Sequence, residues 1–212
     1  RAYVPKSLWP EVQKRLIAQT QELRMGDVRD FRCFVNAVID ERAFQKISGF
    51  LDFARSAPDA KILAGGRGDS KTGYFIEPTI VETDNPRFKT LVEEIFGPVL
   101  TVLPYEDSRL EEALDFCDQA SPYALTGAVL AQDRGDLNHM TGRLRHAAGN
   151  FYLNDKPTGA VVGQQPFGGG RASGTNDKAG SMLNLLRWLS PRTIKENLVP
   201  PKDFRYPFLG AE

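Results

Sequence analysis

An acidic and an aromatic residue stand two positions apart in the segment EEIFGPV, residues 93–99. The carboxylate of Glu94 can accept two hydrogen bonds from a diol, and the ring of Phe96 can cover one face of a flat heterocycle. Gly-Pro cannot continue a helix, and the apolar run at 99–103 predicts a buried strand directly after the pair. The pair therefore suits a nicotinamide riboside at a strand entrance. The alternative for both residues is structural packing.

A glycine-rich segment at residues 159–170, GAVVGQQPFGGG, is the second candidate site. Glycines let backbone amides approach a ligand closely, and successive N–H groups can form an anion-binding nest. Such a loop could hold a carboxylate without an Arg or Lys, while Phe167 packs on an aliphatic chain. Considered alone, the segment could equally be a flexible surface loop.

The cysteines and histidines do not suggest a nucleophile or a metal site. Cys33 and Cys117 have no nearby histidine or helix N-terminus that would lower a thiol pKa, so we expect packed thiols. Two cysteines and two histidines also argue against a disulfide framework or a zinc site. His139 and His146 lie seven apart on one expected helix, where a surface or capping role is the simpler interpretation.

Strands alternate with helices along the chain, which predicts an α/β domain with a mainly parallel sheet flanked by helices. We expect strands at 1–5, 61–64, 74–81, 99–103, 126–130 and 149–154. We expect helices at 7–24, 41–55, 108–117, 135–145 and 181–189, with Ser108 and Glu111 forming a capping box. We expect one domain of residues 1–190, which includes a long loop at 155–180, and a separate extended tail at 191–212.

Composition excludes several classes of partner. Lys and Arg total 27, as do Asp and Glu, so the formal net charge is zero. A neutral chain without a basic cluster gives no electrostatic reason to expect nucleic acid or an anionic membrane as partner. The longest apolar runs are far short of a bilayer span, so we expect no membrane span and a soluble protein. The cysteine content, which does not suggest a disulfide framework, favours an intracellular protein.

The segment at 93–99 resembles a motif of the aldehyde dehydrogenase superfamily. The block at 159–176 resembles the substrate-anchoring loop of one branch, the pyrroline-5-carboxylate dehydrogenases. Further stretches of the same resemblance lie at 37–40, 73–78, 123–129, 149–155 and 187–191. The likeness covers essentially all 212 residues and implies the fold of an aldehyde dehydrogenase catalytic domain, with the C-terminal tail as an oligomerisation arm.

The resemblance also implies roles for single residues. Glu94 matches the family's ribose-binding glutamate, and Phe96 matches the neighbour of the nicotinamide of NAD. Gly159 and Ala160 match the positions whose backbone N–H groups hold the substrate's α-carboxylate. Some members have Ser where this chain has Ala160, so a possible hydroxyl donor is absent here. Phe167 matches an aromatic beside the substrate's methylene chain.

By this resemblance the enzyme oxidises L-glutamate γ-semialdehyde to L-glutamate with NAD in proline breakdown, as a homo-oligomer. The family's nucleophilic cysteine precedes a strand similar to residues 1–5, and its dinucleotide fold lies earlier still. We therefore expect a C-terminal part of a longer enzyme, with no catalytic residue in this chain and an inactive fragment if isolated. We expect a cytoplasmic enzyme in a bacterium and a mitochondrial matrix enzyme in a eukaryote.

Two alternatives remain open at this stage. One is another semialdehyde dehydrogenase, such as one acting on succinate semialdehyde, although a loop suited to an α-carboxylate disfavours it. The other is that the 212 residues are an independent product without catalysis, acting as a binding or interfering subunit. A panel of aldehyde substrates tested on the intact enzyme distinguishes the first alternative from the expected reaction. The intact mass of the native protein distinguishes an independent 212-residue product from part of a longer enzyme.

Overall fold

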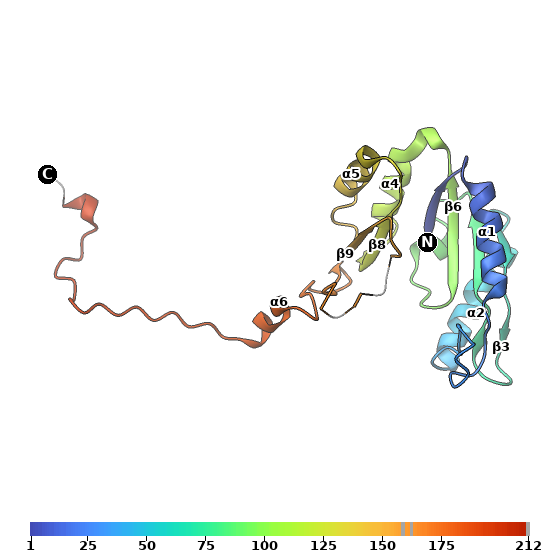
Figure 1. Cartoon of the computed structure of the whole chain (residues 1–212), viewed down its shortest axis with the longest axis horizontal. Helices are drawn as coiled ribbons and strands as arrows, with labels where there is room; N and C mark the ends of the chain where they lie inside the picture. Colours follow the sequence, from blue (N-terminus) through green and yellow to red (C-terminus); the bar gives the residue numbers. More distant parts are fainter. Residues whose placement is uncertain (158–159, 162, 211–212) are drawn as a thin grey trace.

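The largest sheet has four strands, three of them parallel (Figure 1). The computed structural model describes residues 1–157, 160–161 and 163–210. The strands in spatial order are β1 (Ala2–Pro5), β6 (Val99–Tyr105), β5 (Thr79–Thr83) and β2 (Ala60–Ala64). β1 and β5 both pair with β6 in parallel, whereas β2 joins β5 antiparallel at the edge. The expected α/β architecture with a mainly parallel sheet is confirmed.

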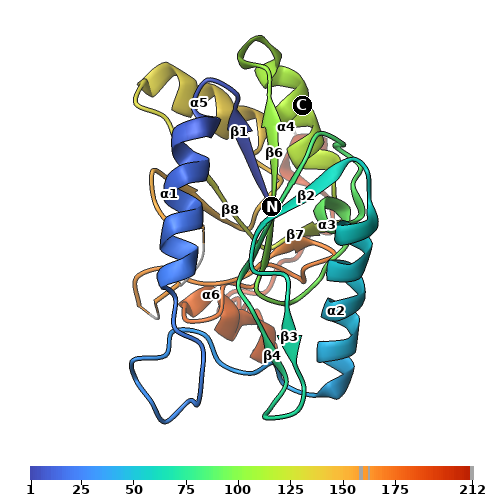
Figure 2. The ribbon, with the colours of Figure 1, turned by 90° about the vertical axis from the view of Figure 1, so that its right-hand side faces the viewer.

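Two long helices cover opposite faces of this sheet (Figure 2). Alternate residues of a strand point to opposite faces. In β6, Val102 packs in the cluster of Trp9 from α1 (Trp9–Glu22), while its neighbour Leu103 packs with Ala54 from α2 (Glu41–Ser56). The sheet is therefore buried on both faces, which explains why β6 is an almost continuous apolar run.

A smaller parallel pair, β8 (Thr126–Val129) and β9 (Asn150–Leu153), lies beside the main sheet (Figure 1). Helices α4 (Leu110–Gln119) and α5 (Arg134–Arg143) share a core cluster with it that contains Leu114, Val129, Leu137 and Leu144. Two further pairs are antiparallel: β3 (Gly68–Asp69) with β4 (Phe75–Ile76), and β7 (Tyr123–Ala124) with β10 (Gly170–Arg171).

Pro78 divides the strand expected at 74–81 into β4 and β5. Pro78 therefore lies at a bend and not on an edge strand, because β5 lies inside the sheet between β6 and β2. A proline cannot donate to the ladder, so the break precedes the paired segment. The short helix α3 (Lys89–Val92) was not expected from the sequence.

Several expected helix boundaries are wrong. A 3-10 turn, η1 (Asp107–Arg109), precedes α4, and the capping box of Ser108 and Glu111 does not form. Glu111 instead accepts hydrogen bonds from α5. Helix α5 ends at Arg143, so His146 does not share a helix with His139. The last expected helix is only α6 (Met182–Leu185), followed by the 3-10 turn η2 (Leu186–Trp188).

The C-terminal segment extends away from the rest of the chain (Figure 1). Between residues 190 and 206 it has no helix or strand, and a single 3-10 turn, η3 (Pro207–Leu209), follows. Its apolar side chains are uncovered: Ile194 is 80% exposed and Phe204 is 98% exposed. Within the described part of the chain, no helix is both long and apolar enough to cross a bilayer.

Candidate active site

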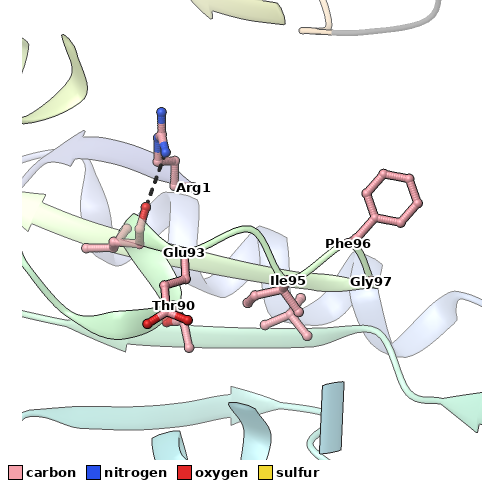
Figure 3. A pocket seen from close by; sticks show the side chains of 8 residues that line it. Arg1, Thr90, Glu93, Ile95, Phe96 and Gly97 are labelled. Carbon is pink, nitrogen blue, oxygen red and sulfur yellow. Dashed lines mark hydrogen bonds between the residues drawn. The ribbon is translucent and has the colours of Figure 1, made fainter. Parts of the chain in front are cut away.

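The turn at residues 93–97 connects α3 to β6 and carries the first pair of expected site residues. Ile95 is buried in a cluster with Ile47 and Phe50 from α2, whereas the flanking Glu94 and Phe96 are exposed. Phe96 has a φ of 60°, in the left-handed region, and its ring is 85% exposed. Figure 3 shows the ring projecting away from the ribbon. One buried side chain thus holds the turn and directs its two neighbours outward.

Helix α2 also holds the backbone of this turn in place. Lys46 Nζ donates a hydrogen bond to the carbonyl oxygen of Glu94 at 2.7 Å. A Cβ added at Gly97 would lie 2.5 Å from Cδ1 of Ile47, which is fully buried, so only glycine allows this close approach. The turn is therefore bound on both sides of Ile95, by a charged donor and by tight packing.

Two cavities adjoin the turn. The first has a volume of about 160 Å³ and is drawn in Figure 3; its lining includes Arg1, Glu93, Phe96 and Val99. Arg1 lines this cavity, and its guanidinium nitrogen Nη1 donates a hydrogen bond to Leu91 O at 3.3 Å. The second has a volume of about 200 Å³ and is lined by Arg1, Glu93, Glu94, Ser121, Tyr123, Leu125, Thr126 and Ala147. Glu94 thus shares a cavity with residues of β7 and β8.

The main chain of Phe167 is hydrogen-bonded on two sides. Its N–H donates to Ala179 O at 2.9 Å, and its carbonyl accepts from Ala179 N–H at 2.8 Å. The side-chain amide of Asn150 bonds to both neighbours of Phe167: Nδ2 donates to Pro166 O at 3.1 Å, and Oδ1 accepts from Gly168 N–H at 3.1 Å. Phe167 itself is half-buried. Its position is therefore set by Asn150 of β9 and by Ala179 near the end of the long loop.

The expected carboxylate nest is only partly described. Gly159 lies outside the described residues, and Ala160 is described as half-buried. Directly after it, Val161 O accepts from the N–H groups of Gln164 and Gln165, both at 2.9 Å. The side-chain Oε1 of Gln165 accepts in turn from Val161 N–H at 2.9 Å. Ala160 thus leads into a closed turn, while the assignment of its amide to a substrate carboxylate stays a prediction.

Strand β7 connects the glycine-rich loop to the second cavity. Tyr123 lines that cavity and pairs with Arg171 in β10, which lies at the C-terminal end of the glycine-rich segment. Ala124 N–H donates to Ser173 Oγ at 2.9 Å, and Ala124 O accepts from Gly149 N–H at 2.9 Å. The two-residue strand β7 therefore places the C-terminal end of the glycine-rich segment near the cavity that Glu94 lines.

Both thiols are half-buried, and Cys117 packs against the core cluster of α4 and α5. Burial raises the pKa of Cys117 above its usual range, which disfavours the thiolate. This agrees with the expectation of a packed thiol. His139 contacts the carboxylate of Glu111, a surface contact between α5 and α4. Among the described residues, no group of three or more His, Cys, Asp or Glu side chains is placed to hold a metal ion.

Two residues that hold the site were not found by sequence reasoning: Lys46 and Asn150. Lys46 lies 48 residues from the turn that it contacts, and Asn150 lies 16 residues from Pro166. Their contacts join segments that are distant in sequence, so no local pattern identifies them. A polar residue at a buried strand position was the one available signal, because Asn150 is only 8% exposed.

A sequence model of the aldehyde dehydrogenase family matches residues 1–194. The chain belongs to this family. Among relatives, it is 56% identical over 209 residues to the mitochondrial delta-1-pyrroline-5-carboxylate dehydrogenase of Dictyostelium discoideum, and 50% identical over 210 residues to that of Homo sapiens. These alignments cover 99% of this chain, but only 38% and 37% of the two relatives. This aldehyde dehydrogenase chain thus spans under two fifths of their length.

The fold of this aldehyde dehydrogenase chain is also similar to solved structures of pyrroline-5-carboxylate dehydrogenases. The delta-pyrroline-5-carboxylate dehydrogenase of Mycobacterium tuberculosis superposes with a TM-score of 0.86 at 49% identity, covering 100% of this chain and 39% of that one. A structure of the same enzyme bound with NAD superposes with a TM-score of 0.84, covering 100% of this chain and 38% of that one. The expected aldehyde dehydrogenase fold is therefore confirmed.

Proposed function

We propose that the protein carrying this chain is an NAD-dependent dehydrogenase that oxidises L-glutamate γ-semialdehyde to L-glutamate. The observation that carries the proposal is the joint position of Glu94 and Tyr123 around one cavity, since Tyr123 lies in the strand that holds the glycine-rich loop. A cofactor-binding turn and a substrate-binding loop would thereby meet. Support for the substrate comes from relatives at 56% and 50% identity that are named delta-1-pyrroline-5-carboxylate dehydrogenases.

The residues of the turn fit one half of a site for NAD. The exposed carboxylate of Glu94 would accept hydrogen bonds from the nicotinamide ribose, and the exposed ring of Phe96 would cover one face of the nicotinamide. NAD would supply the hydride acceptor, while water supplies the second oxygen of the carboxylate product. The dinucleotide fold and the nucleophilic cysteine would come from the remainder of the enzyme.

The glycine-rich loop would bind the substrate. The N–H groups of Gly159 and Ala160 would hold the α-carboxylate, and Phe167 would pack against the methylene chain. Phe167 suits this task because hydrogen bonds to Ala179 and Asn150 fix the backbone around it. A substrate that brings both a carboxylate and a short aliphatic chain would use both parts of the loop.

A Glu94→Gln variant of the full-length protein tests the cofactor assignment. Glutamine has one acceptor oxygen and no charge, so the variant loses hydrogen bonds to the ribose diol worth about 1–3 kcal/mol. We expect this loss to lower kcat/KM for NAD about 5- to 150-fold. NADH absorbance during oxidation of glutamate semialdehyde measures the effect. Glu22→Gln, which changes an exposed glutamate at the end of α1 that lines neither cavity, is the control. Unchanged NAD affinity and turnover in Glu94→Gln would contradict the assignment.

A substrate panel tests the reaction itself. We expect kcat/KM for glutamate semialdehyde to exceed that for succinate semialdehyde. Succinate semialdehyde has no α-amino group, and its carboxylate lies one carbon nearer the aldehyde, so it would not reach the loop in the same way. A preference for succinate semialdehyde would replace the proposed reaction by the rival one. No oxidation of either aldehyde by a protein of confirmed intact mass would favour a non-catalytic subunit.

We also propose that residues 191–212 form an arm that pairs with another copy of the protein. The support is an extended segment with exposed apolar side chains, among them Leu198 at 89% and Val199 at 81%. Extended segments commonly add a strand to a neighbouring sheet. Deleting the arm should lower the mass measured by sedimentation. The proposed compartment is the mitochondrial matrix in a eukaryote, as in the mitochondrial relatives, or the cytoplasm in a bacterium.

A further inference from the structure

Lys178 lies near the end of the long loop at 155–180, and its side chain turns back to the start of β9. Its ammonium nitrogen Nζ donates to Gly149 O at 2.5 Å, to Gly168 O at 3.3 Å and to Asn150 Oδ1 at 3.4 Å. An ammonium has three donors, and here all three meet uncharged oxygens. Two of the acceptors belong to the start of β9 and one belongs to the loop. A single charge therefore joins two segments that are distant in sequence.

We propose that Lys178 is a positioning residue that holds the Phe167–Gly168 segment on β9 and so, through Phe167, sets the affinity of this loop for the substrate. This inference rests on the proposed function, since it names the residue that shapes the same substrate loop. Lys178 would not touch the substrate itself.

The neighbouring carboxylate does not compete for this ammonium. Asp177 accepts a hydrogen bond from Arg187 Nε at 2.7 Å and another from Thr175. The pKa of Asp177 is lowered chiefly by the hydrogen bond from Thr175 and further by that from Arg187, so it is engaged as a carboxylate on the other side of the chain. Lys178, which has a φ of 57°, bonds to uncharged oxygens and not to this carboxylate. Its backbone conformation is one that non-glycine residues rarely adopt.

The two segments are in direct backbone contact at the point where Lys178 joins them. A Cβ added at Gly149 would lie 2.0 Å from Gly168 O and 2.8 Å from Gly169 Cα. The oxygens of Gly149 and Gly168 therefore approach the same ammonium from closely packed chains. Removing the donor would leave both carbonyls without this partner, and the loop would have to move to find another.

Asn150 carries the effect of Lys178 to Phe167. Its Oδ1 receives Lys178 Nζ and Gly168 N–H, which leaves its Nδ2 to donate to Pro166 O. The ammonium thus helps to fix which way the amide faces, and the amide bonds to both neighbours of Phe167. The turn that carries Glu94 is held by a different set of residues, which belong to α2. Loss of Lys178 should therefore affect the substrate and spare the cofactor.

The test uses Lys178→Met in the full-length enzyme, with Lys156→Met as the control. Methionine keeps a long unbranched side chain and removes the donors, and Lys156 is an exposed lysine earlier in the same loop. For Lys178→Met we expect KM for glutamate semialdehyde to rise about tenfold, while KM for NAD and kcat/KM for propanal, an aldehyde without a carboxylate, stay within about twofold. Lys178→Arg, which restores donors and charge, should recover part of the loss.

Hydrogen exchange provides a readout that needs no activity. Lys178→Met should speed amide exchange in peptides that cover residues 164–170 and leave peptides of the 93–97 turn unchanged; Lys156→Met should alter neither. If Lys178→Met does not fold, Asn150→Ala removes the next link of the same chain of contacts and is expected to give the same pattern.

The outcomes separate the inference from the proposed function. A wild-type enzyme that does not oxidise glutamate semialdehyde refutes the proposed function, and exchange at 164–170 then decides the role of Lys178 alone. Exchange as slow as in the wild type would overturn the inference. So would an unchanged ratio of kcat/KM for glutamate semialdehyde over propanal in an active enzyme.

Discussion

The turn that carries Glu94 and the loop that carries Phe167 are held by different physical means. Ile95 inserts into a core formed with Ile47 and Phe50, so the turn rests mainly on apolar packing. The loop is held by hydrogen bonds, from Ala179 and Asn150 around Phe167 and from Lys178. Apolar packing is non-directional and depends on buried area, whereas hydrogen bonds depend on geometry. The turn should therefore respond most to changes of volume, and the loop to loss of donors and of backbone fit.

The largest effect is expected for Ile95→Ala. Removing a side chain that is only 7% exposed costs about 2–5 kcal/mol in the free energy of unfolding, because it loses buried contacts and leaves a cavity. Chemical denaturation of the full-length protein measures it. Phe96→Ala is the matched control: its ring is 85% exposed, so stability should change by less than about 0.5 kcal/mol while NAD binding weakens. Equal destabilisation by both variants would refute the conclusion that Ile95 is packed in the core while Phe96 is exposed for ligand binding.

Gly149→Ala should come next and should affect the loop. Its added Cβ would meet Gly168 O at 2.0 Å, and since that atom is backbone, the chain must shift at a cost of about 1–3 kcal/mol. Thermal unfolding, together with KM for glutamate semialdehyde, records the change. Gly170→Ala, where no atom lies within 4 Å of the added Cβ, should be close to wild type in both measurements. If Gly149→Ala changed neither the melting temperature nor KM, β9 and the loop would have to be packed less closely than in the structure.

A smaller effect is expected for Lys46→Met. The variant removes one charged donor from Glu94 O at an exposed position, a loss of about 1 kcal/mol. We expect about a fivefold rise in KM for NAD, with little change in KM for the aldehyde, measured by steady-state kinetics. Lys14→Met, which changes an exposed lysine of α1, should leave both constants unchanged. A rise confined to the aldehyde KM would show that α2 supports the substrate side instead.

The smallest effect lies outside both regions, at Glu111. The pKa of this carboxyl is lowered chiefly by the hydrogen bond from His139 and further by that from Arg143. A lowered folded-state pKa contributes stability above the ordinary value, and this contribution is lost as the pH falls through the folded-state pKa. Glu111→Gln should remove a small part of the acid dependence of the melting temperature, small because the group is exposed. NAD and aldehyde kinetics at neutral pH should not change; a change there would connect this contact to the site.

The order of the elements could be predicted, because it depends on residues close together in the sequence. The apolar run at 99–103 became the central strand β6, and the helix expected at 41–55 is α2 within one residue. The capping box at Ser108 was wrong, since Glu111 found partners in α5 that lie 28 and 32 residues away. Local pattern recognition has no access to such partners.

The positions of the site residues could be predicted only in part. Glu94 and Phe96 were identified by their spacing, and their exposure follows from the burial of the single residue between them. The shared lining of Glu94 and Tyr123, by contrast, depends on how strands β7 and β8 lie relative to the turn at 93–97. That arrangement comes from packing between elements rather than from any one segment.

The sequence by itself determined the kinds of chemistry available: an acid and an aromatic at a strand entrance, and a glycine-rich loop that lets backbone amides approach a ligand. Composition, spacing and backbone propensity are properties of neighbouring residues, so they can be recognised along the chain. Only the tertiary structure decided what holds these groups: Lys46 and Ile47 for the turn, Asn150 and Lys178 for the loop. These contacts arise when the chain folds back on itself, and their hydrogen bonds and packing exist only at the distances that the fold imposes.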